Sequence, residues 1–422
     1  MSTNPAITDV SLIDPDTTIA AMTEPSQPPA APSPVAALQA AMAVRAAQWA
    51  AMGIDPAALR HVLGSVAAPP GTDTWAGHIS EVGEQAATAA DALASASATP
   101  ADRDRARRRY EEASFWFFLA RFPAPSSPAT WHAYHRSLDT ALLAGELEAT
   151  PLQVVRAPYG KGEVVGHLRL PDPDTSRPAT RTRTALVVLT GGIDVFKADI
   201  EIRSLAEALH AAGAATLAVD MPGTGESPVP AAPGHEATYE ALLAALAADP
   251  NLADRLDLDH VGVIGLSFGG HWATRLALTN PRVAAAVSIS GPLHHTFSPA
   301  NVAAAPPPTR AALAAALGAT SSDPATVTPL VAALSVLDGT AGNLIAAASP
   351  VPILALTGGR DELVPVQDTT LLTEHGYPAD LLIYATDRHV ASNHWTEHVP
   401  VLTDWIMHRL THTAASRLPS LS

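Results

Sequence analysis

The clearest indication of the fold comes from the stretch His260–Trp272, which reads HVGVIGLSFGGHW. Its apolar run Val261–Ile264 leads without a linker into GLSFG, and an amphipathic helical pattern over Trp272–Leu278 follows at once. This order predicts a strand, a sharp turn and a helix. The two glycines of the turn let strand and helix approach closely, which forces Ser267 into a strained backbone conformation with an exposed hydroxyl group. Ser267 is therefore the candidate nucleophile, and the alternative is an ordinary serine between two turn glycines.

Length and composition limit the class of protein. A chain of 422 residues leaves room for a catalytic domain of roughly 250 residues and a smaller second domain. The formal net charge of -16 argues against nucleic acid or an anionic membrane as a partner, because both require clustered Lys and Arg. A small-molecule substrate fits better, and self-association into a homodimer is left open. The absence of cysteine excludes disulfides and thiolate zinc sites, and neither a metal nor a cofactor is expected. We also expect a cytoplasmic protein, because the sequence shows neither a secretory signal nor a membrane span.

Periodicity divides the chain into regions. Residues 1–34, rich in Pro, Ser and Thr, are expected to be a disordered tail, and residues 413–422 a flexible one. Residues 35–147 have helical spacing, and we expect the aromatic residues around Phe115 and Trp116 to pack in a core. The charge run Asp102–Arg109 reads as a solvated helix face.

From Leu152 onward strands alternate with helices, which predicts a hairpin followed by a mostly parallel sheet covered on both faces. The strands are predicted at Leu152–Ala157, Val164–Leu170, Thr184–Leu189, Ala215–Val219, Val261–Ile264, Val283–Ser290, Val351–Leu356 and Asp380–Tyr384. The covering helices are predicted at Ala198–Ala212, Ala237–Ala248, Trp272–Leu278 and Glu397–Leu410. Residues 292–350 lack a strand pattern, so we expect a helical insertion above the carboxyl ends of the strands.

A serine nucleophile needs a base and a third group that orients the base. Asp361 follows the strand Val351–Leu356, and His389 follows the last strand. The order Ser267, Asp361, His389 along the chain is the one found in α/β-hydrolases, so these residues are the predicted catalytic triad. Alternatives are Asp387 as the acid and His394 or His398 as the base, although both histidines fall at or within the closing helix, where we expect solvent exposure.

The reaction also needs N–H donors for a developing oxyanion. We expect one from the backbone of Phe268, at the start of the helix after Ser267. The second is expected from Gly192 or Ile193, in the loop TGGID after the third strand.

Several polar residues are candidates for substrate binding. Asp194 follows the oxyanion loop directly, and a carboxylate there repels the developing charge unless it binds a substrate hydroxyl group. Lys197 is a second candidate, with a surface lysine as the alternative, and His294 a third, with a core or surface role as the alternative. The stretch Asp220–Ser227, DMPGTGES, reads mainly as a structural tight turn beside the site.

The chain resembles the FrsA-like α/β-hydrolases, a group that includes 2,6-dihydroxypseudooxynicotine hydrolase and fungal hydrolases that shorten polyketide chains. The resemblance spans about residues 70–412 and rests on GGIDVFKAD at 191–199, DMPGTG at 220–225, GLSFGG at 265–270, GGRD at 358–361 and DRHV at 387–390. It implies an α/β-hydrolase domain over 148–412 with its helical insertion over 292–350, and a helical cap domain over 35–147. It also implies triad roles for Ser267, Asp361 and His389, and a substrate-orienting role for Asp194.

These observations support several functions. The first is a cofactor-independent hydrolase that cleaves a carbon–carbon bond next to a ketone in a polyketide-like or aryl ketone, with His389 protonating the departing carbanion or enolate. The others are a carboxylesterase or thioesterase, a lyase or cyclase of secondary metabolism that eliminates a group such as acetate, and a binding protein without catalysis. We further expect the helical domain and the insertion to roof the site jointly and to enclose an apolar pocket.

Overall fold

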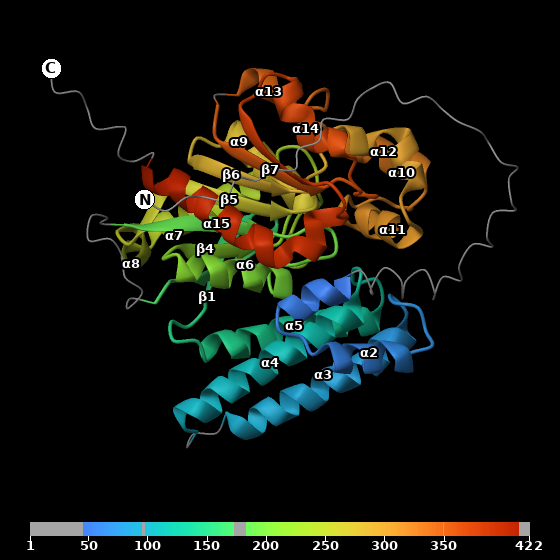
Figure 1. The fold of residues 1–422 in the computed structure, drawn as a ribbon, viewed down its shortest axis with the longest axis vertical. Coiled ribbons are helices and arrows are strands. Elements are labelled where there is room, and N and C mark those ends of the chain that lie inside the picture. The colour runs from blue at the N-terminus through green and yellow to red at the C-terminus, as the bar shows by residue number, and fades with distance from the viewer. Residues whose placement is uncertain (1–44, 95–97, 173–182, 349, 413–422) are drawn as a thin grey trace, which may run out of the picture.

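The computed structural model describes residues 45–94, 98–172, 183–348 and 350–412. The tails predicted at 1–34 and 413–422 lie outside the described residues. Figure 1 shows a helical body, in blue and cyan, beside a sheet that carries helices on both faces. Within the described ranges, no helix combines the length and the apolar character that a membrane span requires.

The central sheet has eight strands in the order β1-β2-β4-β3-β5-β6-β7-β8. The strands are β1 (Gln153–Tyr159), β2 (Gly162–Arg169), β3 (Thr184–Thr190), β4 (Ala215–Val219), β5 (Leu256–Leu266), β6 (Val283–Ile289), β7 (Ile353–Gly358) and β8 (Ala379–Tyr384). β2 pairs antiparallel with both β1 and β4, and every other pairing is parallel. The predicted hairpin and mostly parallel sheet are confirmed. β5 begins at Leu256 rather than Val261, because Leu256 already pairs with Thr184 before the register shifts.

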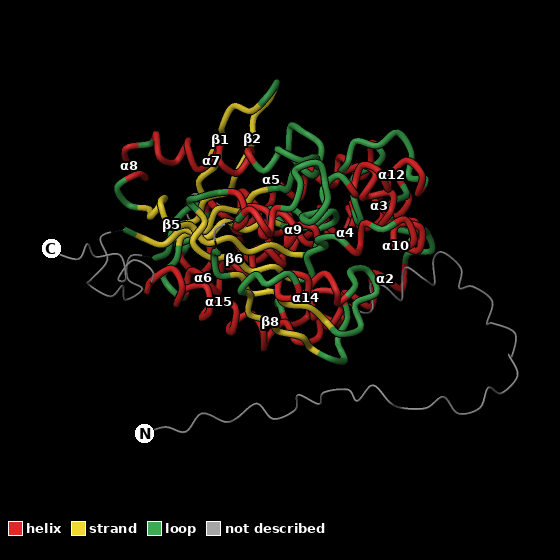
Figure 2. Tube along the Cα trace, turned by 90° about the horizontal axis from the view of Figure 1, so that it is seen from above, coloured by secondary structure: helices red, strands yellow, loops and turns green. Residues whose placement is uncertain are grey.

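Apolar cores fill both faces of the sheet. Leu186 and Val188 of β3 belong to one core, and Val187 and Leu189 to the other. Successive side chains of a strand point to opposite faces, so a strand buried on both faces reads as a continuous apolar run. The first core is covered by α7 (Ala237–Ala248), α9 (Phe268–Thr279) and α14 (Val366–Glu374), with the short α8 (Pro250–Ala253) after α7. The second is covered by α6 (Ile200–Ala211) and α15 (Trp395–His412), on the other side of the strands in Figure 2.

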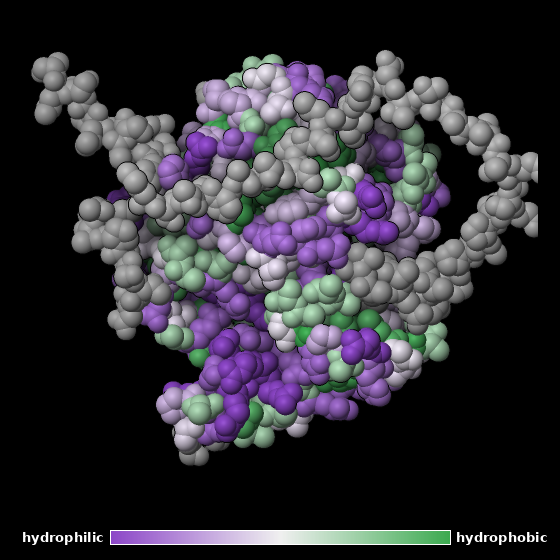
Figure 3. All heavy atoms as spheres, in the orientation of Figure 1, coloured by the Kyte–Doolittle hydropathy of each residue, from purple (hydrophilic) through white to green (hydrophobic). Residues whose placement is uncertain are grey.

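The amino-terminal helices form a separate packed body. Residues 45–51 are helical, followed by α2 (Pro56–Ser65), α3 (Asp73–Leu93), α4 (Pro100–Arg121) and α5 (Pro128–Glu146). As predicted, Phe115 and Trp116 are buried, and they form an aromatic cluster with Trp49. The charge run at the start of α4 lies largely at the surface, where Arg105 pairs with Asp102. Figure 3 shows strongly hydrophilic surface over this end of the helical body.

The insertion after β6 is helical, as predicted. It contains η1 (His295–Phe297), α10 (Pro299–Ala304), α11 (Pro307–Ala316), α12 (Pro324–Ala332) and α13 (Leu344–Ala347). α10, α11 and α12 each begin with proline, whose fixed φ suits the first turn and whose missing N–H is not needed there. In its described part the β pairing is one isolated bridge between Gly339 and Gly342. Figure 1 shows α10, α11 and α12 gathered at one end of the sheet.

Candidate active site

Ser267 occupies the predicted sharp turn between β5 and α9. Its backbone has φ 53° and ψ −124°, a conformation that L-residues rarely adopt. The Ser267 N–H donates to the carbonyl of Ile289 at 2.7 Å, which fixes the turn against β6. The strained serine at a strand-to-helix turn is therefore confirmed.

The flanking glycines make this turn sterically feasible. A Cβ atom at Gly265 would lie 2.0 Å from the carbonyl oxygen of Gly269. One at Gly269 would lie 2.4 Å from the carbonyl oxygens of both Thr190 and Gly191. Because these contacts are with backbone atoms, no side-chain movement relieves them. The two glycines are needed for the close approach of β5, α9 and the loop after β3.

The three predicted triad side chains lie together at the carboxyl ends of the strands. His389 Nε2 lies 2.9 Å from Ser267 Oγ, and His389 Nδ1 lies 2.8 Å from Asp361 Oδ2. Asp361 follows β7, and His389 begins η2 (His389–His394), which follows β8. The imidazole thus bridges the hydroxyl group and the carboxylate, as general-base activation of a serine requires.

The carboxylate of Asp361 is held in one orientation. Its Oδ1 accepts hydrogen bonds from the N–H groups of Leu363 and Val364, both at 2.9 Å. Burial alone would raise the pKa of the Asp361 carboxyl group, but the attraction to His389 and the hydrogen bonds from His389, Val364 and Leu363 together lower that pKa. Asp361 therefore stays ionised, which favours the tautomer of His389 that carries its proton on Nδ1.

Two hydroxyl groups that the sequence analysis did not single out support the histidine loop. Ser290 Oγ accepts from the N–H of Val390 at 2.9 Å and lies 2.8 Å from Thr357 Oγ1. Thr357 in turn donates to Asp361 Oδ2 at 3.3 Å. Val390 has φ 55°, so the loop after His389 is itself strained and needs such support.

The alternative acid and bases have other partners. Asp387 accepts from His394 Nδ1 and from Asn393 Nδ2, both at 2.7 Å. Burial alone would raise the pKa of Asp387, but its hydrogen bonds, first among them the one from His394, lower it. The expected solvent exposure of His398 is wrong, because its side chain is 0% exposed and packs against Trp395. Burial lowers the pKa of His398 to about 4, so it is neutral at pH 7.

The residues predicted to supply the oxyanion donors lie beside the nucleophile. Phe268 is the first residue of α9, so its N–H has no acceptor within the helix. Gly192 lies against the turn at Ser267 between β5 and α9, here called the elbow. A Cβ atom at Gly192 would be 2.9 Å from Ser267 Cβ and 3.3 Å from Phe268 N. Ile193, the alternative to Gly192, is buried with its side chain at a different cavity. The backbone of Gly192 thus packs against Ser267 and Phe268, and the choice of Gly192 over Ile193 as the second donor stays a prediction.

Asp194 lies close to the nucleophile, as expected. It lines a small cavity of about 10 Å³ together with Ser267. The other residues of this small cavity are Arg45, Gln48, Gly192, Val195, Glu201, Leu266 and Val390. Arg45 Nη2 lies 3.1 Å from Asp194 Oδ2, so the carboxylate is paired with a cation from the helix at residues 45–51.

Lys197 is neither a surface lysine nor placed to contact substrate. Its side chain is 0% exposed, and Nζ lies 2.6 Å from Asp220 Oδ2 and 2.7 Å from Glu226 Oε2. Burial alone would lower the pKa of the Lys197 ammonium group, but attraction to both carboxylates raises it. Asp220 also accepts from the N–H of Glu226 at 2.9 Å, which confirms the structural reading of this turn.

His294 lines neither the cavity beside Ser267 nor the larger cavity lined by Ile193 and Trp131. Its Nδ1 lies 2.9 Å from Ser335 Oγ and 3.2 Å from Asp338 Oδ1, within the insertion. Its backbone N–H donates to Asp368, a buried carboxylate that also accepts from His295 and Thr296. His294 therefore belongs to the base of the insertion rather than to the site.

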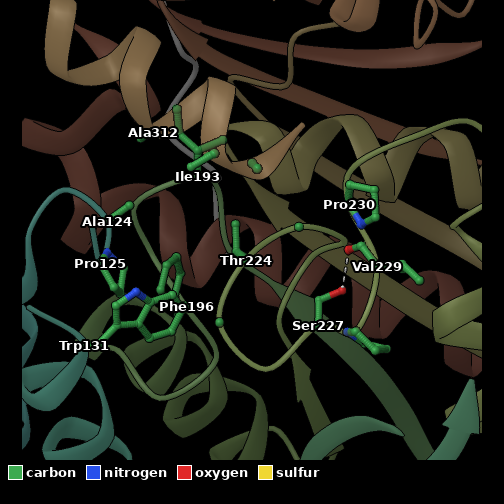
Figure 4. Close-up of a pocket in the computed structure, with 15 residues that line it drawn as sticks. Ala124, Pro125, Trp131, Ile193, Phe196, Thr224, Ser227, Val229, Pro230 and Ala312 are labelled. Carbon is green, nitrogen blue, oxygen red and sulfur yellow. Dashed lines mark hydrogen bonds between the residues drawn. The ribbon is translucent and has the colours of Figure 1, made fainter. Parts of the chain in front are cut away.

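A larger cavity of about 330 Å³ lies beside this site. Figure 4 shows Trp131 and Phe196 on one side of it and Ser227, Val229 and Pro230 on the other. The helical body contributes Ala124, Pro125 and Trp131, and α11 contributes Ala312, Ala315 and Ala316. The helical body and the insertion line this cavity jointly, but Ser267, Asp361 and His389 do not line it, and Thr224 and Ser227 make it less apolar than expected. The expected roof over the site itself therefore stays a prediction. Ile193 lines this cavity and its neighbour Gly192 lines the small one.

Across residues 45–94, 98–172, 183–348 and 350–412, no group of three or more His, Asp or Glu side chains is arranged to hold a metal ion.

Comparisons with known proteins show the family and the fold. The model of the family described as "Esterase FrsA-like" matches residues 139–411. The chain is 26% identical over 342 residues to esterase FrsA of Vibrio cholerae serotype O1, covering 78% of this chain and 79% of the relative. Its fold is similar to that of the 2,6-dihydroxy-pseudo-oxynicotine hydrolase, with a TM-score of 0.70, 20% identity, and coverage of 87% of this chain and 96% of that one. It is also similar to AbyA5, with a TM-score of 0.69, 23% identity, and coverage of 90% and 97%. The chain is therefore an α/β-hydrolase enzyme that belongs to the FrsA-like esterase family.

Proposed function

We propose that this enzyme uses Ser267, His389 and Asp361 to cleave the bond next to a carbonyl group in a small polyketide-like or aryl ketone. The observation that carries this proposal is the hydrogen-bonded series from Ser267 through His389 to Asp361 at the strained turn after β5. Membership of the esterase family supports an acyl-enzyme route, and the likeness in fold to the 2,6-dihydroxy-pseudo-oxynicotine hydrolase supports a small organic substrate.

The proposed reaction begins at the serine hydroxyl group. His389 Nε2 takes the proton of Ser267 as Oγ bonds to the carbonyl carbon, and the N–H groups of Phe268 and Gly192 bind the resulting oxyanion. When the oxyanion collapses, the carbon–carbon bond breaks and its electron pair leaves as a carbanion or enolate. The imidazolium of His389 protonates that group. His389 then takes a proton from water, and the resulting hydroxide attacks the acyl-enzyme. As the acid leaves, His389 returns this proton to Ser267 Oγ.

Asp194 supports a ketone substrate over a simple ester. The ion pair with Arg45 offsets part of the charge of Asp194, and the carboxylate opposes the developing negative charge of the oxyanion less when it also accepts a hydrogen bond from the substrate. A hydroxyl group on the leaving portion of the substrate would provide that bond. The esterase name of the family favours a carboxylesterase as the second candidate, for which Asp194 would matter little.

Two variants separate these functions. Ser267→Ala should lose at least about 10³-fold of kcat/KM on any substrate, whereas the exposed Ser126→Ala should keep full activity. A fluorophosphonate probe should label Ser267, as read by peptide mapping, and no labelling would indicate a protein without catalysis. Asp194→Ala should reduce turnover of a 1,3-diketone more than that of an activated ester. Equal residual activity of Asp194→Ala on both substrates would favour the carboxylesterase.

Heavy-oxygen water distinguishes hydrolysis from elimination. Hydrolysis through an acyl-enzyme places the label in the released acid and leaves the other product saturated. A new double bond in that second product would instead indicate the lyase alternative.

A further inference from the structure

Three polar atoms near Ser267 have no hydrogen-bond partner in the part of the chain that the structure describes. They are Nη1 of Arg45, Nε2 of Gln48 and Oε2 of Glu201, each buried without a hydrogen bond among the described residues. All three residues line the small cavity that contains Ser267. Gln48 and Glu201 are each only 2% exposed, so bulk water does not satisfy these atoms. Buried polar groups are normally paired, and such a cluster at one cavity indicates a ligand.

The surrounding contacts hold these atoms in place. Glu201 Oε1 accepts from the indole N–H of Trp49 at 2.9 Å. Trp49 itself packs edge-on against Phe115, with ring centroids 5.5 Å apart. Arg45 is oriented by its ion pair with Asp194. Two of the three side chains, those of Glu201 and Arg45, are therefore held through their other polar atoms, as a preorganised binding site requires.

The space and the hydrogen-bonding pattern specify the ligand group. A volume of about 10 Å³ holds one oxygen atom, roughly the space of a single water. Burial raises the pKa of the Glu201 carboxyl group, so Oε2 can accept or carry a proton. Two N–H donors and this carboxyl group match an oxygen that can both accept and donate, which is a hydroxyl group. A ketone oxygen has no proton for Glu201, and a second carboxylate would be repelled by both Glu201 and Asp194.

We propose that Arg45, Gln48 and Glu201 form a subsite for one hydroxyl group, alcoholic or enolic, carried by the substrate close to the carbonyl carbon that Ser267 attacks. This inference rests on the proposed nucleophilic role of Ser267 and adds to it a requirement on the substrate. It also gives the helix at residues 45–51 a direct part in specificity.

The test compares substrate pairs that differ by one hydroxyl group. The pair p-nitrophenyl 3-hydroxybutyrate and p-nitrophenyl butyrate places it on the acyl portion, and the pair 2-hydroxyphenyl acetate and phenyl acetate places it on the leaving portion. The wild-type enzyme should prefer the hydroxylated member of at least one pair by about tenfold in kcat/KM. No preference in either pair would overturn the subsite without the use of any variant.

Variants then assign the preference to these residues. Gln48→Leu removes a donor at nearly constant shape, and Glu201→Gln replaces the acceptor while keeping the oxygen that Trp49 needs. Each should raise KM for the hydroxylated ester by about tenfold more than for its partner ester. The exposed Gln367→Leu and Glu81→Gln are matched controls that should change neither ester.

An equal effect of Gln48→Leu and Glu201→Gln on both members of each pair would show that the cavity holds only a buried water, which overturns the proposal. Labelling of Ser267 by a fluorophosphonate separates the test of the subsite from the test of the proposed function. Labelling without hydroxyl preference refutes the subsite alone, whereas no labelling refutes the proposed function.

Discussion

Arg121 offers a direct test of how the helical body is attached to the site. Its side chain is 0% exposed, and the guanidinium group donates to the carboxylate of Asp199. It also donates to the carbonyl oxygens of Pro123 at 3.2 Å and Asp194 at 3.3 Å. The guanidinium carbon lies 3.8 Å from the centroid of the Phe196 ring. One side chain of α4 thus contacts the loop after β3 at three of its residues.

We predict that Arg121→Met destabilises the fold by about 3–5 kcal/mol, because it leaves Asp199 buried without its counter-ion. Burial raises the pKa of Asp199, and Arg121 is the strongest influence that opposes this rise. Without Arg121 the pKa of Asp199 rises further above its value in the unfolded chain. Folding then favours the protonated carboxyl group, and this contribution is lost as pH rises through the folded-state pKa. The destabilisation should therefore be larger at pH 8 than at pH 5.

Urea unfolding of four proteins measures the effect: wild type, Arg121→Met, Asp199→Asn and the double variant. Asn at 199 still accepts the hydrogen bond from the N–H of Phe196, which is 2.6 Å long, so the double variant removes mainly the ion pair. It should be less destabilised than the sum of the single variants by at least about 1 kcal/mol. Arg105→Met, which breaks an exposed pair with Asp102, is the control and should change stability by less than about 1 kcal/mol. Additive single effects, or equal losses at Arg121 and Arg105, would refute this reasoning.

Three further predictions concern Asp361, Gly269 in the elbow and the buried His398. Asp361→Asn should lower kcat/KM on an activated ester by about 10³ to 10⁴-fold, because an amide does not favour the His389 tautomer that the serine needs. The free energy of unfolding in urea should change little. Retained activity would show that Asp361 has no part in the mechanism. Gly269→Ala should destabilise the fold by about 2 kcal/mol or more, since its Cβ would lie 2.4 Å from backbone oxygens, whereas Gly77→Ala, whose Cβ would meet nothing within 4 Å, should not destabilise it. Burial lowers the pKa of His398 to about 4 from 6.5, so its stabilising contribution is present above pH 6.5 and is lost as pH falls toward 4. This loss amounts to about 1.4 kcal/mol per pH unit, so the free energy of unfolding of His398→Phe should depend less steeply on pH between 4 and 6.5 than that of the wild type. Parallel pH profiles of the two proteins would contradict the burial of a neutral His398.

The sheet and the nucleophile were predictable because their signals are local. A strand buried on both faces must be apolar throughout, and a crowded strand-to-helix turn must carry glycine on each side of the nucleophile. Asp361 and His389 were found for a related reason: parallel strands bring their carboxyl ends to one edge, so residues directly after β7 and β8 converge there.

The burial of His398 also had a local signal, which the sequence analysis did not use. Leu402, Ile406 and Leu410 follow it at intervals of four residues, and all three are 0% exposed. Residues at that spacing share one face of a helix. A histidine that continues an apolar stripe therefore belongs to the core, so the burial of His398 could have been predicted from the sequence of the closing helix.

Lys197 had no such signal, because its partners come from elsewhere in the chain. Glu226 and Asp220 lie in the loop after β4, while Lys197 follows β3. Their contact depends on the pairing of β3 with β4, which brings those two loops side by side. Partners of this kind become visible only when the strand order is known.

The loop after β3 links the nucleophile to the helical body. Its backbone at Gly191 limits the size of residue 269 in the elbow, and its Gly192 lies against Ser267. Asp194 in the same loop is held by Arg45 through its side chain and by Arg121 through its carbonyl oxygen. Both arginines belong to the amino-terminal helices, so a shift of those helices would move the loop that carries Asp194 and Gly192 relative to Ser267. The position of the predicted oxyanion donor Gly192 therefore depends on the helical body as well as on the elbow.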